Sequence, residues 1–106
     1  MNDVPDATDL TSFLAIVGEG GSMTAEQAET AFDGFMSGGA SEIQMAGLLM
    51  ALQSRGVSSA EVAGGVRALR KAMIPVRSNR VDALVDTAGT GGGAVTTFNI
   101  STAAAI

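Results

Sequence analysis

One stretch decides the fold class of this chain: Asp86-Thr87-Ala88-Gly89-Thr90-Gly91-Gly92-Gly93, in which four glycines fall within five residues. The apolar run Ala83-Leu84-Val85 precedes it and predicts a short strand over Ala83–Thr87, and residues 101–106 follow the loop as a helix-like run. A strand, a glycine loop and a helix start commonly bind phosphate, because loop amides converge where no Cβ blocks them and the helix end adds free N–H groups. We therefore expect residues 83–106 to begin an α/β phosphate-binding domain.

Upstream of the loop, the spacing of apolar residues predicts four short amphipathic helices within residues 9–74. Asp9 is placed to cap the first helix, and three Ser/Thr-x-x-Glu/Gln capping boxes start the others, at Thr24, Ser41 and Ser58. The third helix is apolar nearly all the way round, so we expect it to be central and buried. The fourth carries one apolar face, and its Gly64-Gly65 pair marks close helix packing rather than a backbone near a ligand. The residues of that face are Val62, Val66, Leu69 and Met73.

The predicted organisation is a tail at 1–8, a helical domain at 9–75, a linker at 76–82 and an α/β start at 83–106. One strand cannot form a sheet, and a parallel strand needs a partner after a crossover. We therefore expect these residues to be the N-terminal part of a larger protein, with an α/β domain cut short. The alternative is a complete small protein with an exposed Ala-rich tail.

Composition excludes several kinds of site. The 106 residues contain no Cys and no His, so disulfides, thiol chemistry and imidazole bases are absent, and a metal would have oxygen ligands, as Mg²⁺ or Ca²⁺ do. The net charge of −5 argues against a nucleic-acid partner. No run approaches a membrane span and no basic leader starts the chain, so we expect a cytoplasmic protein without a membrane partner. All six bases lie in residues 55–80, which we interpret as a solvated basic helix end, the alternative being an anion-binding patch.

The loop lacks the Lys of a nucleoside-triphosphate P-loop, and on its own it is a weak dinucleotide motif. The longer string Asp86-x-x-Gly89-Thr90-Gly91-Gly92, followed by Asn99-Ile100-Ser101-Thr102, resembles the signature of the anthranilate phosphoribosyltransferase family. Four helical segments resemble that family's N-terminal helical domain in the same order and spacing: residues 23–28, 35–38, 44–49 and 55–61.

The resemblance implies transfer of the phosphoribosyl group of phosphoribosyl pyrophosphate to anthranilate, with Mg²⁺, in tryptophan biosynthesis. It implies a homodimer formed through the helical domain. By the same resemblance, a sugar-phosphate and pyrophosphate site would be lined by Gly89, Gly92, Gly93 and Thr97. Phosphates and ribose would be held by Asn99, Ile100, Ser101 and Thr102. Ser101 would also reach the Mg²⁺, and Gly89 would lie near anthranilate.

One position departs from the family pattern, which reads Gly-Thr-Gly-Gly-Asp-Gly, because Gly93-Ala94 stand where Asp-Gly is expected. We expect weaker binding of phosphoribosyl pyrophosphate as a result, and no activity from residues 1–106 alone. Two alternatives stay open. One is a pyrimidine nucleoside phosphorylase-like enzyme. The other is a non-catalytic dimerisation module, with its face formed by Leu10, Phe13 and Leu14 or by the fourth helix.

Overall fold

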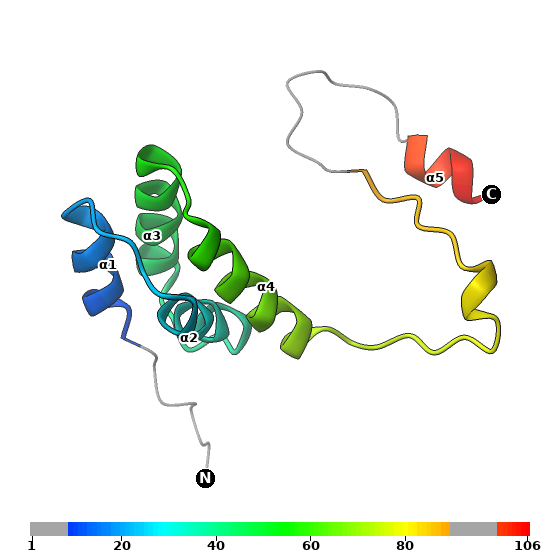
Figure 1. The fold of residues 1–106 in the computed structure, drawn as a ribbon, viewed down its shortest axis with the longest axis horizontal. Coiled ribbons are helices and arrows are strands. Elements are labelled where there is room, and N and C mark those ends of the chain that lie inside the picture. Colours follow the sequence, from blue (N-terminus) through cyan, green and yellow to red (C-terminus); the bar gives the residue numbers. More distant parts are fainter. Residues whose placement is uncertain (1–8, 90–99) are drawn as a thin grey trace, which may run out of the picture. The chain divides into compact units, whose positions relative to one another are not determined.

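The computed structural model describes residues 9–89 and 100–106. They divide into two compact units, Met1–Ile74 and Pro75–Ile106, and each unit is described by itself. The first unit contains the four predicted helices (Figure 1): α1 (Thr11–Gly18), α2 (Ala25–Met36), α3 (Glu42–Arg55) and α4 (Ser59–Ala72). Within it α1 packs closely on α3, and α2 packs closely on α4.

Local hydrogen bonds explain where the helices begin. Thr24 accepts from the Gln27 amide at 3.2 Å, and the Gln27 side chain accepts from the Thr24 amide at 2.8 Å, which confirms that capping box. The box at Ser58 is also complete. The box at Ser41 is half formed: Ser41 Oγ accepts from the Gln44 amide at 3.2 Å, but Gln44 Oε1 accepts from the Ser41 hydroxyl at 3.3 Å instead of from the Ser41 amide. Gln44 Nε2 donates to Asp9 Oδ1 at 3.0 Å.

The start of α1 differs slightly from the prediction. Leu10 occupies the N-cap position, and Asp9 lies one residue earlier. Asp9 nevertheless accepts from the Thr11 amide at 3.0 Å, so its carboxylate satisfies a free donor of the first turn. These hydrogen bonds, first the hydroxyl and then the amide of Thr11, lower the pKa of Asp9.

The interface between α2 and α4 depends on Gly64. A Cβ added there would lie 2.6 Å from Ala28 Cβ and 2.7 Å from the Glu29 amide nitrogen, so only glycine permits this approach. The packing interpretation of the glycine pair is thus confirmed at Gly64. At Gly65 the space is wider, since an added Cβ would lie 3.6 Å from the Phe32 ring.

Oppositely charged residues line the same interface. Lys71 pairs with Asp33 at 2.6 Å, and Arg67 lies 3.6 Å from Glu26 and 3.7 Å from Glu29. Arg67 and Lys71 of α4 therefore face the acidic residues of α2. In this part of the chain, the separation of acidic and basic residues along the sequence places opposite charges across the interface between α2 and α4.

The core gathers small and medium apolar side chains from the first three helices and the turn between α1 and α2. Its buried members are Leu10, Val17, Met23, Ala28, Ala31, Leu48 and Leu52. Half-buried phenylalanines pack on it, and the Phe32 and Phe35 rings lie 4.9 Å apart in a tilted pair. With so few aromatics, the core depends on close approach of helices.

The predicted burial of α3 was wrong. In α3 only Leu48 and Leu52 are buried, while Ile43 is 85% and Met50 67% exposed, so this helix is not central. In α4 the apolar face from Val62 to Met73 is exposed, and the buried residues are Glu61, Gly64, Gly65 and Ala68. The reason is that Gly64 brings the other side of α4 against α2.

The second unit contains a 3₁₀ turn, η1 (Val81–Ala83), and a short helix, α5 (Ile100–Ala105). No strand forms within residues 9–89 or 100–106, so the strand predicted at Ala83–Thr87 is not confirmed. Leu84 has extended backbone angles, but strand pairing needs a neighbour. The helix predicted near Ser101 begins at Ile100. Within the same residues, no helix has the length and apolar character to cross a membrane.

Candidate functional site

The described part of the glycine segment brings its two flanks together. Asp86 Oδ1 accepts from the Ala88 amide at 2.8 Å, which forms a local turn just before the glycines. A Cβ built on Gly89 would lie 3.9 Å from Ser101 Oγ, so these two predicted site residues are neighbours. Gly89 and Ser101 therefore lie close together although eleven residues separate them in the sequence.

The structure describes only some of the predicted site residues. Ile100 and Thr102 lie at the start of α5 and are exposed, and Ser101 between them is half-buried. Four others, Gly92, Gly93, Thr97 and Asn99, lie outside the described residues. The structure thus brings together Gly89 and Ser101, and the remainder of the predicted site stays a prediction.

The chemistry available around Gly89 and Ser101 is that of an oxygen donor. A serine hydroxyl both donates to and accepts from phosphate oxygens, and it can supply one oxygen to a hard cation. Among the described residues there is no group of three acidic side chains that could hold a metal by themselves. The Ser101 hydroxyl can therefore contribute one oxygen to such a cation, but the described residues do not hold one by themselves.

An apolar groove crosses the helical unit between α3 and α4. Its volume is about 320 Å³. It is lined by Phe32, Leu49, Leu52, Gln53, Val57, Glu61, Val62, Gly65, Val66 and Leu69. The groove contains Val62, Val66 and Leu69 of the exposed apolar face of α4.

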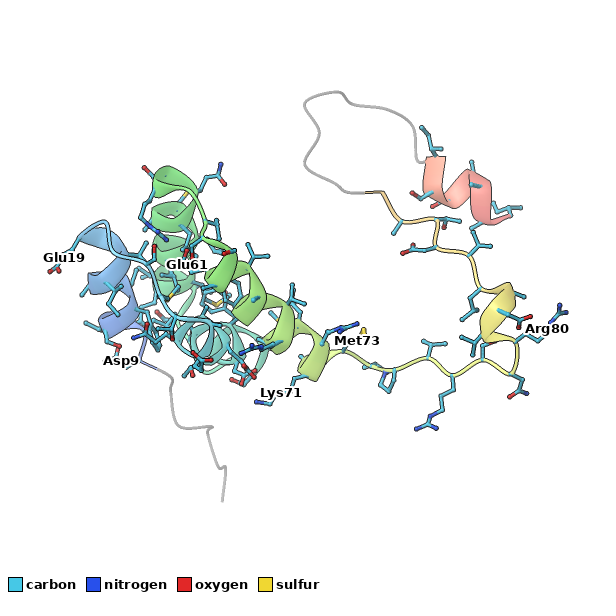
Figure 2. All side chains as sticks on the ribbon, in the orientation of Figure 1. Asp9, Glu19, Glu61, Lys71, Met73 and Arg80 are labelled. Carbon is cyan, nitrogen blue, oxygen red and sulfur yellow. The ribbon has the colours of Figure 1, made fainter. Side chains whose placement is uncertain are left out.

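The most highly bonded side chain of the helical unit is Glu61, which is 1% exposed. Its two carboxylate oxygens accept from Arg55 Nη2 at 2.6 and 2.7 Å, from the Met23 amide at 2.9 Å and from the Ser58 amide at 2.8 Å. Arg55 Nη1 donates in turn to Ser22 Oγ at 2.7 Å. Glu61 lies among the ends of α3 and α4 and the turn before α2 (Figure 2).

These contacts set the charge state of Glu61. Burial by itself raises the pKa, but the hydrogen bonds from Arg55 and from the Ser58 and Met23 amides outweigh it, and the pKa falls to about 2. The carboxylate is therefore charged at neutral pH although it is buried. Arg55 is its counter-ion, and the Nε of Arg55 is buried without a hydrogen-bond partner among the described residues.

Sequence reasoning predicted Glu61 only as a capping residue. The spacing Ser58-x-x-Glu61 identifies the cap, but it does not reveal that the same carboxylate binds Arg55 and the Met23 amide. A possible indicator was present, because Glu61 is the only acid in residues 55–80. A lone acid among six bases is a candidate for an ion pair.

Comparison with known proteins extends these observations. Residues 11–73 match the family described as "Glycosyl transferase family, helical bundle domain". The chain is 46% identical over 101 residues to an anthranilate phosphoribosyltransferase of Azospirillum brasilense, with 95% of the chain and 28% of the relative covered. A protein of the same name from Rhizobium meliloti is 42% identical over 99 residues, with 93% of the chain and 29% of the relative covered.

A third similar protein, the anthranilate phosphoribosyltransferase of a Shewanella species, is 40% identical over 102 residues, with 93% of the chain and 29% of the relative covered. The chain therefore spans less than a third of the length of these curated relatives. No solved structure matches. Since the first alignment covers 95% of the chain, the similarity includes the glycine segment as well as the helices.

Proposed function

The chain belongs to the glycosyl transferase family that carries this helical bundle domain, and from that premise we propose that it provides the helical bundle and glycine loop of an anthranilate phosphoribosyltransferase. The observation that carries the proposal is the 46% identity to such an enzyme over 95% of the chain. The proposed reaction belongs to tryptophan biosynthesis and is proposed to take place in the cytoplasm. Its substrates are phosphoribosyl pyrophosphate and anthranilate.

In this reaction the amino nitrogen of anthranilate forms a bond to C1′ of the ribose. The bond from C1′ to the pyrophosphate oxygen breaks, the pyrophosphate leaves with the electron pair, and the nitrogen releases one proton to water. Negative charge grows on the leaving group while C1′ becomes cationic. Groups that interact more strongly with the leaving pyrophosphate than with the bound substrate accelerate the step.

The chain's own residues fit that need. The amides of a glycine loop are fixed dipoles that can be aimed at phosphate oxygens without rearrangement during the reaction. The close approach of Gly89 and Ser101 supports a site in which the loop and the start of α5 act on the same phosphates. Anthranilate is already an amine nucleophile, so a chain without histidine is compatible with the chemistry.

A Mg²⁺ on the pyrophosphate, when bound, would neutralise part of the charge of the leaving group. Ser101 would supply one oxygen ligand to it. Because a Mg²⁺ site usually includes one or two carboxylates beside phosphate, the remaining protein ligands are sought elsewhere in the enzyme.

Dimerisation through the helical unit is part of the proposal. The first helix is a poor candidate for the whole face, since Leu10 is fully buried in the core and Phe13 and Leu14 are half-buried. Exposed apolar residues are found instead on α3, at Ile43 and Met50, and on α4. These surfaces are the ones that a second copy would cover.

A chimera tests the function. Residues 9–106 of this chain would replace the matching segment of the Azospirillum brasilense relative, and consumption of anthranilate would be followed by its fluorescence. We expect activity that requires phosphoribosyl pyrophosphate, and growth of a tryptophan-requiring strain that lacks the enzyme. Ser101→Ala in the chimera should raise KM for phosphoribosyl pyrophosphate.

The controls make the result decisive. The unaltered relative shows that the assay works, and circular dichroism with sedimentation shows that the chimera is folded. A folded chimera that leaves anthranilate untouched would contradict the proposal. Consumption of thymidine and phosphate instead would favour the nucleoside phosphorylase alternative.

A further inference from the structure

The helical unit consists of two helix pairs, α1 with α3 and α2 with α4. Because the paired helices alternate along the chain, the backbone crosses from one pair to the other three times, at residues 19–24, 37–41 and 56–58. The two pairs share an apolar core. What holds them together beyond that core determines whether they can separate.

The polar contacts between the pairs gather at one carboxylate. Glu61 accepts from the Met23 amide in the first crossing and from the Ser58 amide in the third. Arg55, at the end of α3, donates to both oxygens of Glu61 and to Ser22. Among the described residues, each side-chain hydrogen bond or ion pair that joins one helix pair to the other involves Glu61 or Arg55.

The remaining polar contacts stay within a pair. The hydrogen bond from Gln44 to Asp9 joins α3 to the start of α1, and the ion pairs of Arg67 and Lys71 join α4 to α2. The middle crossing contains Gly38 with a positive φ of 72°, which glycine adopts without strain. The first and third crossings lie at the Glu61 end, and the third is only residues 56–58, so the chain prevents the two pairs from parting there as folded bodies. That end can open only if the helices of one pair unfold.

We propose that Glu61 is a clasp: it holds α3 and the turn between α1 and α2 against the α2–α4 pair, and when its contacts break, α1 and α3 unfold while the α2–α4 pair stays folded. Three features support this partial unfolding. The α2–α4 contact is close and extensive at Gly64. The polar contacts between the pairs are confined to the Glu61 end. The broken ion pair regains water as the end opens, which offsets part of the lost attraction. This inference does not depend on the proposed enzyme activity.

Native-state hydrogen exchange of residues 1–106 in increasing urea tests the clasp. We expect the amides of α1 and α3 to exchange through an opening smaller than global unfolding, and those of α2 and α4 to exchange only when the whole unit unfolds. Glu61→Gln should speed exchange of the α1 and α3 amides by at least ~100-fold, since Arg55 loses its buried counter-ion.

A variant inside one pair is the matched control. Ala68 is buried on α4 one turn beyond Gly64. Because the α2–α4 pair survives the proposed opening, Ala68→Gly should speed exchange of the α2 and α4 amides roughly tenfold and leave α1 and α3 unchanged. Three results would overturn the proposal: one shared opening for all four helices, uniform acceleration by Ala68→Gly, or no acceleration of α1 and α3 by Glu61→Gln. If Glu61→Gln does not fold, the urea series of the wild type and of Ala68→Gly still shows whether α1 and α3 open separately from α2 and α4.

Discussion

Two adjacent glycines of α4 should respond in opposite directions to the same substitution. Alanine favours a helix interior over glycine by roughly 1 kcal/mol, and both Gly64 and Gly65 lie within α4. At Gly64 the new Cβ would lie 2.6 Å from Ala28 Cβ and 2.7 Å from the Glu29 amide nitrogen. These distances are roughly 1 Å shorter than ordinary contacts, so α2 and α4 must move apart.

The change in the free energy of unfolding at each glycine is the sum of a helix-propensity gain and an overpacking cost. Overpacking costs about 1–3 kcal/mol, and more where the neighbour is backbone, as it is at Glu29. Gly64→Ala should therefore lower the free energy of unfolding by about 1–3 kcal/mol after the helix gain is included. Gly65→Ala meets only the Phe32 ring at 3.6 Å, so it should raise stability by up to about 1 kcal/mol.

Urea unfolding followed by circular dichroism at the helix band measures both variants beside the wild type. The difference between them should be about 1–4 kcal/mol, which for a unit of this size corresponds to roughly 4 °C or more in Tm. The reasoning about the α2–α4 contact is refuted if Gly64→Ala is as stable as Gly65→Ala. It is also refuted if both substitutions stabilise the protein by the same amount.

Three further predictions concern charge and the loop. The pKa of Glu61 lies at about 2 in the folded protein against 4.5 ordinarily, so its contribution of about 3 kcal/mol is complete above pH ~5 and is lost as pH falls toward ~2. Unfolding titrations at stepped pH should show this loss, and the slope should disappear in Glu61→Gln. Lys71→Ala breaks an exposed ion pair with Asp33, so it should move the urea midpoint far less than Gly64→Ala does. In the chimera, Gly93→Asp restores the carboxylate of the family pattern and should lower KM for phosphoribosyl pyrophosphate; an unchanged KM would count against a role for that position.

The sequence predicted those features that depend on near neighbours. The capping boxes at Thr24 and Ser58 formed as expected, because their donors and acceptors lie three residues apart and need nothing else. The glycine pair predicted close helix packing at Gly64, but the sequence did not indicate that α2 is the helix packed there. The short distance from Gly89 to Ser101 agrees with the predicted site.

Features that depend on distant partners were not predictable in the same way. An apolar residue such as Ile43 indicates that a surface can be buried, but not which neighbour buries it, so the predicted central position of α3 was wrong. The role of Glu61 depends on Met23, which lies 38 residues away. A strand at Ala83–Thr87 requires a hydrogen-bonding neighbour, and an apolar run of this length does not specify one.

The alternation of the helix pairs has a consequence for the kinetics of folding. Since α1 pairs with α3 and α2 with α4, neither pair is a hairpin of consecutive helices. Each interface requires closure of a loop that contains an entire intervening helix, which slows folding relative to a bundle of neighbouring hairpins. During translation, α2 lacks its closely packed partner until the ribosome has released α4, which ends at Ala72. Until then the side of α2 that α4 covers remains exposed, and nascent chains that stall before that point are the ones that a chaperone would be expected to bind.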